Sequence, residues 1–157
     1  MEVQPIGVIR SPFNEPAGMP IQPTGAVGVK GLVEVLPEYA DGLQDLDGFS
    51  HIIIVYLFDR SIGYELKVVP FMDATLRGLF STRAPRRPNP LGLSVVRLER
   101  VDGRCLHIDG VDVLDETPLL DIKPYVPAFD APTECRTGWL EDAGEIARAK
   151  RSDGRFA

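Results

Sequence analysis

The chain has 157 residues, 44% of them hydrophobic and 25% charged, which is the composition of one globular domain with a substantial core. Fourteen prolines and fifteen glycines disfavour a helical bundle and favour a loop-rich β architecture. The formal net charge of -6 excludes a surface that coats nucleic acid by overall charge, but it is compatible with a local basic groove.

The first half of the chain predicts short strands and one long loop. An opening strand over 3–12 ends in Ser11-Pro12, and the loop over 12–25 carries four prolines and two glycines without periodicity. Alternation predicts a half-buried strand over 27–36. Residues 37–49 predict a short helix or turn. The β-branched run over 52–58 predicts a strand buried on both faces.

The second half predicts further short strands and one helix. We expect strands over 65–69, 77–83, 91–101, 104–108, 110–114 and 119–126, with a hairpin at Asp102-Gly103. The only convincing helix covers 139–152. This pattern predicts an all-β or β-rich fold: a single closed β-barrel domain over 1–138, followed by a short C-terminal helix and tail over 139–157.

Several functional classes lack their sequence signatures. The chain has no internal repeat, no GxGxxG after a strand, no Walker loop, no HExxH and no GxSxG. Cys105 and Cys135 form no metal-binding pair, so we expect free thiols and no metal. The longest apolar run is too short to span a bilayer and no signal-like segment opens the chain, which predicts a cytoplasmic protein without membrane contact.

The stretch STRAPRRPNPLGLS, residues 81–94, packs three arginines and three prolines into fourteen positions. We call residues 81–90 the basic loop. Its prolines hold the preceding residues extended, which lowers the entropy lost when a loop binds a ligand. Arg83, Arg86 and Arg87 can each make bidentate contacts to a carboxylate or phosphate. The alternative is a rigid turn with solvated arginines.

Acidic residues gather later in the chain, where Asp112, Asp115, Glu116 and Asp121 fall within ten positions. Carboxylates at a strand end can bind ribose hydroxyls or a cation, or act as a general base. The alternative is ordinary turn chemistry, because Asp and Glu are common in turns.

The buried run over 52–58 is bounded by polar residues. His51 precedes it, and Asp59 and Arg60 follow it. His51 is either a hydrogen-bonded structural residue or a catalytic group, and Asp59 with Arg60 is either part of a site or an exposed pair of little energy.

Taken in order, the blocks IGVIRSP, IQPTG, FSHI, LFSTRAPRRPNPLGLS and DVLDETPLLDIKPY resemble the TrmO-type (TsaA-like, YaeB-like) family of S-adenosylmethionine-dependent tRNA methyltransferases. The resemblance runs from about residue 3 to residue 130, and its RPNPLG and DIKPY blocks are long and distinctive. It implies a TsaA-like β-barrel that binds S-adenosyl-L-methionine without a Rossmann sheet and acts as a homodimer. The implied reaction methylates N6 of threonylcarbamoyl-adenosine next to the tRNA anticodon.

The resemblance also implies a cofactor site. Its residues would be Pro23, Thr24, Gly25, Asp59, Arg60, Arg83, Leu93, Asp112, Val113, Leu114 and Asp115. An arginine suits the carboxylate of the cofactor, and aspartates suit its ammonium group or ribose. The backbone of a Pro/Gly loop can approach the adenine edge closely.

Methyl transfer is an in-line displacement, so positioning should supply most of the catalysis. A base that removes the N6 proton would help, and the candidates are, in order, Asp115, His51 and Glu116. The RNA phosphates or the threonyl carboxylate would be held by Arg86, Arg87, Asn89 and Lys123.

Glu116 stands where the family has a glycine, which predicts an altered turn. Because the chain has no large basic face, tRNA affinity would need a dimer that merges two basic loops. Two alternatives remain: a methyltransferase that acts on a small molecule or protein, and a non-enzymatic S-adenosylmethionine-binding or anion-binding regulatory module.

Overall fold

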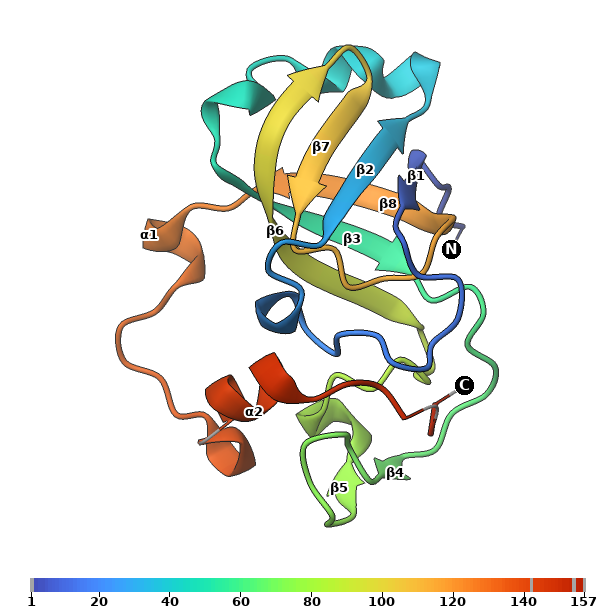
Figure 1. The fold of residues 1–157 in the computed structure, drawn as a ribbon, viewed down its shortest axis with the longest axis vertical. Helices are drawn as coiled ribbons and strands as arrows, with labels where there is room; N and C mark the ends of the chain where they lie inside the picture. The colour runs from blue at the N-terminus through green and yellow to red at the C-terminus, as the bar shows by residue number, and fades with distance from the viewer. Residues whose placement is uncertain (1, 142, 154, 157) are drawn as a thin grey trace.

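The computed structural model describes residues 2–141, 143–153 and 155–156, and its centre is a closed antiparallel barrel (Figure 1). Around the barrel the strands pair in the order β1 (Gly7–Arg10), β2 (Lys30–Val35), β7 (Cys105–Asp109), β6 (Leu91–Asp102), β3 (His51–Leu57) and β8 (Thr117–Pro124). β8 pairs back onto β1 and closes the barrel. The predicted closed β-barrel is confirmed.

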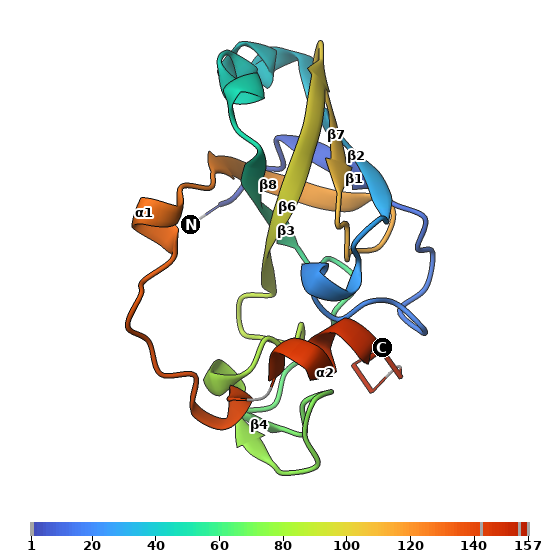
Figure 2. The same cartoon turned by 60° about the vertical axis from the view of Figure 1, so that its left-hand side comes forward.

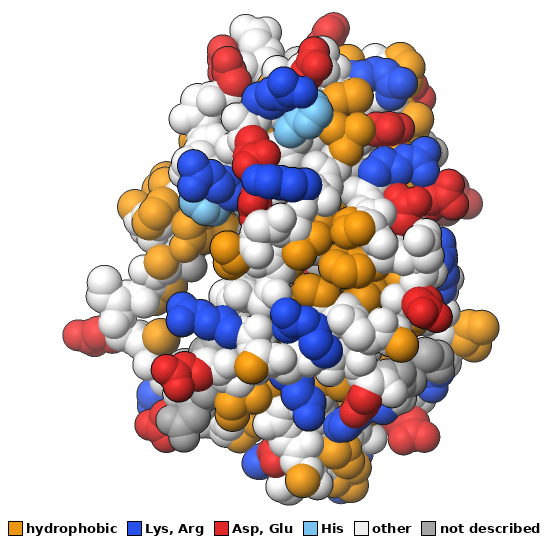
Figure 3. Space-filling view, viewed as in Figure 1, with side chains coloured by type: hydrophobic (Ala, Val, Ile, Leu, Met, Phe, Trp, Pro, Cys, Tyr) orange, Lys and Arg blue, Asp and Glu red, His pale blue; other side chains and the backbone are white. Residues whose placement is uncertain are grey.

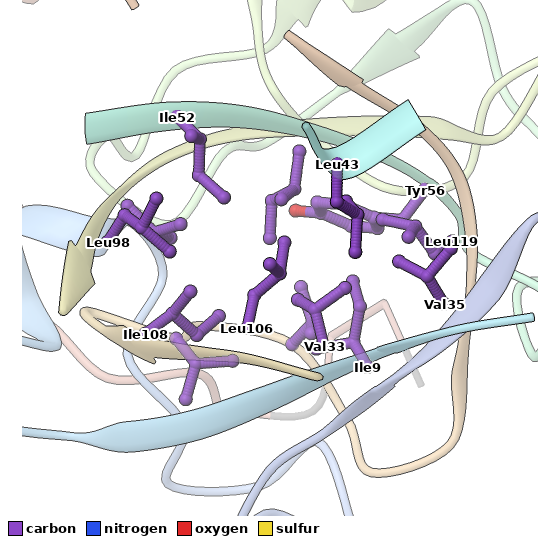
Figure 4. Packing of buried hydrophobic residues seen from close by; sticks show 14 residues of the cluster. Ile9, Val33, Val35, Leu43, Ile52, Tyr56, Leu98, Leu106, Ile108 and Leu119 are labelled. Carbon is purple, nitrogen blue, oxygen red and sulfur yellow. The ribbon is translucent and has the colours of Figure 1, made fainter. Parts of the chain in front are cut away.

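The core fills the barrel because alternate residues of each strand face inward. On β3 these are Ile52, Ile54 and Tyr56, which pack with residues such as Leu106 and Leu119 (Figure 4). The outward residues of β3 are only half-buried. The prediction that both faces of this strand are buried is therefore wrong, because a closed barrel leaves its outer face to solvent or to a partner.

One end of the barrel, which we call the hairpin end, is formed by tight turns. The predicted β6–β7 hairpin is present, but its two-residue turn is Gly103-Arg104, one residue beyond the predicted Asp102-Gly103, because Asp102 still pairs with Cys105; Gly103 is at φ +58°. The expected helix or turn over 37–49 consists of two 3-10 helices, η2 (Pro37–Leu43) and η3 (Leu46–Gly48).

The opposite end, which we call the loop end, carries the longer connections. η1 (Pro23–Gly25) lies there, and below it a two-stranded sheet of β4 (Lys67–Val68) and β5 (Arg77–Gly78) leads into η4 (Leu79–Ser81) (Figure 1). The strands expected over 65–69 and 77–83 are thus much shorter than predicted, because local turns hold the rest of both segments.

The strand expected over 110–114 is wrong. Gly110 turns the chain at φ +94°, and the amides of Gly110 and Val111 donate to the Val29 carbonyl instead of continuing a strand ladder. The segment is a loop, and we call residues 110–116 the acidic loop.

After β8 the chain leaves the barrel surface. Residues 127–138, which include the one-turn helix α1 (Pro127–Asp130), are all exposed and arch away from the strands in both ribbon views (Figures 1 and 2). The chain then returns through η5 (Gly138–Leu140) to α2 (Ala143–Ala149), which packs against η1. α2 is shorter than the helix predicted over 139–152, whose position 142 lies outside the described residues.

Three simpler observations complete the fold. Cys105 and Cys135 are free, as expected. Across the described ranges, no helix is both long and apolar enough to cross a membrane. Nor do three or more His, Cys, Asp or Glu side chains in that part of the chain gather as a metal site.

Candidate functional site

Ser11 joins the loop over 12–25 to the acidic loop at the loop end of the barrel. Its hydroxyl donates to the Val113 carbonyl at 2.6 Å, and its amide donates to Oδ1 of Asp115 at 3.1 Å. The Asp115 amide in turn donates to the Phe13 carbonyl at 2.7 Å. Two segments about a hundred residues apart in sequence therefore form one unit.

Arg60, directly after β3, braces the same unit from outside. Its guanidinium donates to the Asp115 carbonyl at 3.0 Å and to the Asn14 carbonyl at 3.4 Å. Asp59 beside it is exposed. Of these two predicted residues, Arg60 thus lies against the acidic loop and organises backbone there.

Arg83 brings the basic loop to η1. Its guanidinium donates to Oε1 of Gln22 at 2.9 Å, immediately before Pro23, Thr24 and Gly25. η1 itself is covered by α2: a Cβ at Gly25 would lie only 2.9 Å from the Ala147 carbonyl oxygen, so this position needs glycine.

Asp112 lies on the inner side of this assembly. Its Oδ1 accepts a hydrogen bond from the Ser94 hydroxyl at 2.8 Å. Part of the residue's surface reaches solvent, but packed protein surrounds the carboxyl, and this burial raises its pKa to about 6 against the opposing influence of the Ser94 hydrogen bond and the Arg83 charge. Val113 beside it is buried, and the Leu114 carbonyl accepts from Thr117.

Within the basic loop, Arg87 holds the loop itself. Its guanidinium donates to the carbonyls of Thr82 at 3.0 Å, Ala84 at 3.3 Å and Leu79 at 3.5 Å, and it lies over the Phe80 ring. Arg86 is half-buried and Asn89 is exposed. The loop therefore combines the two roles considered from sequence: Arg87 shapes it, and Arg83 reaches the site.

Three predicted residues lie apart from this cluster or already have partners. His51 begins β3 on its outer face, so the length of the strand, roughly 20 Å, separates it from Asp59. Lys123 pairs with Asp121 at 2.7 Å on the same outer side. Glu116 pairs with Arg10 at 3.0 Å and adopts the left-handed conformation at φ +66°, a conformation that favours glycine.

Leu93 belongs to an apolar stripe on the outside of the barrel. We call it the outer stripe, and it consists of three cross-strand pairs of β3 and β6: Ile53 with Val95, Val55 with Leu93, and Leu57 with Leu91. Leu93 and Leu91 are 53% and 47% exposed and the other four residues are half-buried, so the stripe is apolar and partly exposed.

Three residues of the site were missed by sequence reasoning. Ser11 was interpreted only as a turn residue, and Tyr56 only as part of an apolar run. Ser94 carried a signal, because it is a polar residue at an inward position of an alternating strand between Gly92 and Val96. Its partner could not be identified without the fold.

The donor set fits a ligand that carries a carboxylate, a cation and sugar hydroxyls. Arg83 supplies an exposed guanidinium, Asp112 and Asp115 supply carboxylates, and Leu93 supplies apolar surface. S-adenosyl-L-methionine has these groups, so the residues at the loop end fit the cofactor that the sequence implies.

Comparison with known proteins agrees with the fold and with the implied cofactor. The chain is 52% identical over 153 residues to a probable S-adenosyl-L-methionine-binding protein of Pyrococcus abyssi, covering 98% of this chain and 83% of the relative. It is 37% identical to a tRNA (adenine(37)-N6)-methyltransferase of Mus musculus, covering 82% of this chain and 32% of the relative. A crystal structure of TrmO from Pseudomonas aeruginosa matches with a TM-score of 0.76 and 41% identity, covering 88% of this chain and 61% of that one.

The chain thus spans less than two thirds of the mouse relative and of the solved chain. The sequence model of the tRNA-methyltransferase O N-terminal domain matches residues 8–131, which is most of the chain. This protein therefore belongs to the tRNA-methyltransferase O N-terminal domain family.

Proposed function

We propose that this protein is an S-adenosyl-L-methionine-dependent tRNA methyltransferase that modifies N6 of threonylcarbamoyl-adenosine next to the anticodon. The observation that carries the proposal is the union of three loops, through Ser11, Arg60 and Arg83, at one end of a barrel of this family. A tRNA substrate also supports a cytoplasmic location.

When bound, the cofactor supplies an electrophilic methyl group, and the protein supplies its position. Arg83 would hold the cofactor carboxylate, and Asp112 and Asp115 its ammonium group or ribose hydroxyls. Backbone of η1 and of Val113–Leu114 would line the adenine side, with Asp59, Arg60 and Leu93 around the rim.

Asp115 is the base that we favour for the N6 proton. It lies inside the loop cluster, where its Oδ1 accepts from the Ser11 amide and its Oδ2 is the proton acceptor in this scheme. Glu116 is engaged by Arg10. His51 stands at the other end of β3, which ranks it last.

The RNA would meet the face that carries η1. On this face hydrophobic side chains gather near η1 and the adjacent ends of β2 and β7, and Lys and Arg side chains lie above and below them (Figure 3). Arg86, Arg87, Asn89 and Lys123 are our candidates for contacts to RNA, and Arg87 and Lys123 would have to share their present partners.

We further propose that two copies associate through the outer stripe, which would bring two basic loops together. A partly exposed apolar stripe of this kind favours a partner surface of similar chemistry. In sedimentation velocity, Leu91→Glu should convert a dimer to a monomer, while Leu76→Glu, equally exposed but away from the stripe, should leave the dimer intact. A monomeric wild type would contradict the proposal.

The reaction is tested with purified protein, labelled S-adenosyl-L-methionine and tRNA with or without threonylcarbamoyl-adenosine. We expect methylation of the modified tRNA only. Asp115→Asn, which removes both the proposed base and a proposed cofactor contact, should abolish transfer even at saturating S-adenosyl-L-methionine. The control is Asp102→Asn, which leaves an equally favourable hairpin turn at the hairpin end.

A second candidate is a non-enzymatic S-adenosylmethionine-binding module. It is favoured by the name of the Pyrococcus abyssi relative, which mentions binding alone. Saturable cofactor binding without methylation of tRNA, small molecules or protein in an extract would support it.

The division into a barrel over 1–138 and a C-terminal part over 139–157 is likewise our proposal, based on the exposed arch that joins them.

A further inference from the structure

The barrel core contains the hydroxyl group of Tyr56, which needs a hydrogen-bond partner. Tyr56 is only 3% exposed, and its oxygen points into the interior among aliphatic side chains (Figure 4). A buried hydroxyl without a hydrogen bond is costly. The Tyr56 hydroxyl lies 3.0 Å from the hydroxyl of Ser94, which is also buried.

Gly92 makes this contact sterically feasible. It pairs with Tyr56 across β3 and β6, and a Cβ at this position would lie 2.1 Å from a ring carbon of Tyr56. No side chain can occupy position 92 while the ring stays in place. The LGLS segment therefore combines a glycine that admits the ring with a serine two residues later, on the same inward face, that meets its hydroxyl.

The direction of the hydrogen bonds follows from the chemistry of the three groups. A carboxylate only accepts, so the Ser94 hydroxyl donates its one proton to Oδ1 of Asp112 at 2.8 Å. Ser94 must then accept from the Tyr56 hydroxyl. The result is a chain of two hydrogen bonds, from Tyr56 to Ser94 and from Ser94 to Asp112, that runs from the core to the acidic loop. We call this chain the relay.

The charge of Asp112 depends on this relay. Burial opposes ionisation of its carboxyl, and the Ser94 hydrogen bond and the Arg83 charge favour ionisation. Burial likewise raises the pKa of Tyr56, so its hydroxyl stays a donor. Arg83 is the one cation that acts on both groups within the described chain, and it also binds Gln22 beside η1.

We propose that Tyr56 and Ser94 are positioning residues of the cofactor site, which hold the Asp112 carboxylate in one orientation beside Arg83 so that it can recognise a cationic or hydroxyl group of the ligand. The inference rests on the proposed function for the identity of that ligand. The ordering of the acidic loop by the relay does not depend on it.

The first measurement is hydrogen exchange of the ligand-free protein. Ser94→Ala and Tyr56→Phe should speed exchange of the amides over 110–117 about fivefold, because the loop loses its internal anchor. Val96→Ala is the matched control: it lies at the next inward position of β6 and makes no hydrogen bond with its side chain. It should leave the ratio of loop exchange to barrel exchange unchanged.

The second measurement is the affinity for S-adenosyl-L-methionine by calorimetry from pH 5 to 8. We expect about tenfold weaker binding for Ser94→Ala and about fivefold for Tyr56→Phe, with full affinity in Val96→Ala. The pH at which wild-type affinity declines should move upward in Ser94→Ala, because the hydrogen bond that favours ionised Asp112 is gone. Ser94→Thr, which keeps the hydroxyl, should restore much of the affinity.

The two measurements separate the possible failures. If wild type binds the cofactor and the Ser94 and Tyr56 variants bind equally well with an unchanged pH profile, the positioning role is wrong. Unchanged exchange over 110–117 in both variants overturns the anchor. If folded wild type does not bind S-adenosyl-L-methionine while exchange responds as expected, the proposed cofactor is wrong and the anchoring role of the relay stands.

Discussion

The two ends of the barrel hold their connections in different ways. At the hairpin end the chain turns mainly through backbone geometry, with Gly103 at positive φ and the Val35 amide bonded to the Arg104 carbonyl. The Arg104 side chain adds one bond, to the Val35 carbonyl at 2.9 Å. At the loop end, side chains bind backbone carbonyls: Ser11 and Arg60 bind those of other loops, and Arg87 binds those of its own loop.

This difference indicates where function can be changed without loss of the barrel. A backbone turn depends little on neighbouring side chains, so it tolerates substitution and offers few groups for chemistry. Loops held by side chains form a connected network in which one substitution moves several groups. The hydrogen-bonded residues of the candidate site lie at the loop end, where side chains hold the loops.

The largest effect should come from Gly92→Ala. The added methyl group would overlap the Tyr56 ring, so we expect the free energy of unfolding to fall by about 3 kcal/mol. Gly42→Ala, at the hairpin end with open space around the position, should change it by less than about 0.5 kcal/mol. Urea unfolding of both variants measures the difference.

A second background tests the cause. When Tyr56 is replaced by Leu, the ring that the added methyl group would meet is gone, so Gly92→Ala should be much less destabilising there than in wild type. Equal losses in the two backgrounds would contradict the steric explanation.

The next largest effect should be a pH dependence from Asp112. Its pKa is raised from 3.8 to about 6 in the folded protein, so the folded state binds the proton more tightly than the unfolded state. Stability from this group is therefore highest below about pH 4 and is lost as the pH rises through 6. Relative to Asp112→Asn, wild type should lose on the order of 2 kcal/mol between pH 4 and 7.

The comparison with Asp112→Asn is necessary because Asp109 has a lowered pKa, owing mainly to its hydrogen bond with Lys30, and gives a slope of opposite sign in both proteins. Urea unfolding at half-unit pH steps measures the difference between the two curves. A flat difference would mean that Asp112 ionises in the folded protein as it does in the unfolded chain.

Local sequence patterns predicted the barrel well because each strand obeys a period of two. Alternation identified β2 and β6, and Asp102-Gly103 placed the hairpin that separates β6 from β7. The segment over 110–114 failed because its valines suggested a strand, whereas positive φ at Gly110 sends the chain into a loop. A search for alternating apolar residues cannot recognise a loop whose valines are buried, because such a loop has the same pattern as a strand.

The site was less predictable for a different physical reason. Motifs placed Arg83, Asp112 and Asp115 in it, but the contacts that hold them run between segments distant in sequence. Ser11 meets Val113 and Ser94 meets Asp112 only after the barrel has closed. Such contacts depend on how strands distant in sequence pair with one another, and this pairing cannot be inferred from a single sequence.

A smaller effect should follow from Arg87→Lys. Nη1 of the Arg87 guanidinium donates to the Thr82 and Ala84 carbonyls of the basic loop and to the Leu79 carbonyl of η4. The planar group also lies over the Phe80 ring, and a lysine ammonium group cannot reproduce that stacking. We expect a loss of about 1 kcal/mol in the free energy of unfolding. Arg100→Lys, which replaces a single contact to His107 near the hairpin end, should lose less. Equal losses in denaturant melts would contradict the clamp.

A smaller effect still, and a stabilising one, should come from Glu116→Gly. Glu116 adopts φ +66°, which is unfavourable for a residue with a Cβ, and its exposed ion pair with Arg10 contributes little. Because glycine relieves the strain but adds freedom to the unfolded chain, the net gain should be about 0.5 kcal/mol. Asp45→Gly is the matched change at the hairpin end, at φ +64°, and should gain less, because Asp tolerates this conformation better than Glu. Thermal melts of both variants decide the point: destabilisation by Glu116→Gly would mean that the Arg10 contact, and not the backbone, governs this turn.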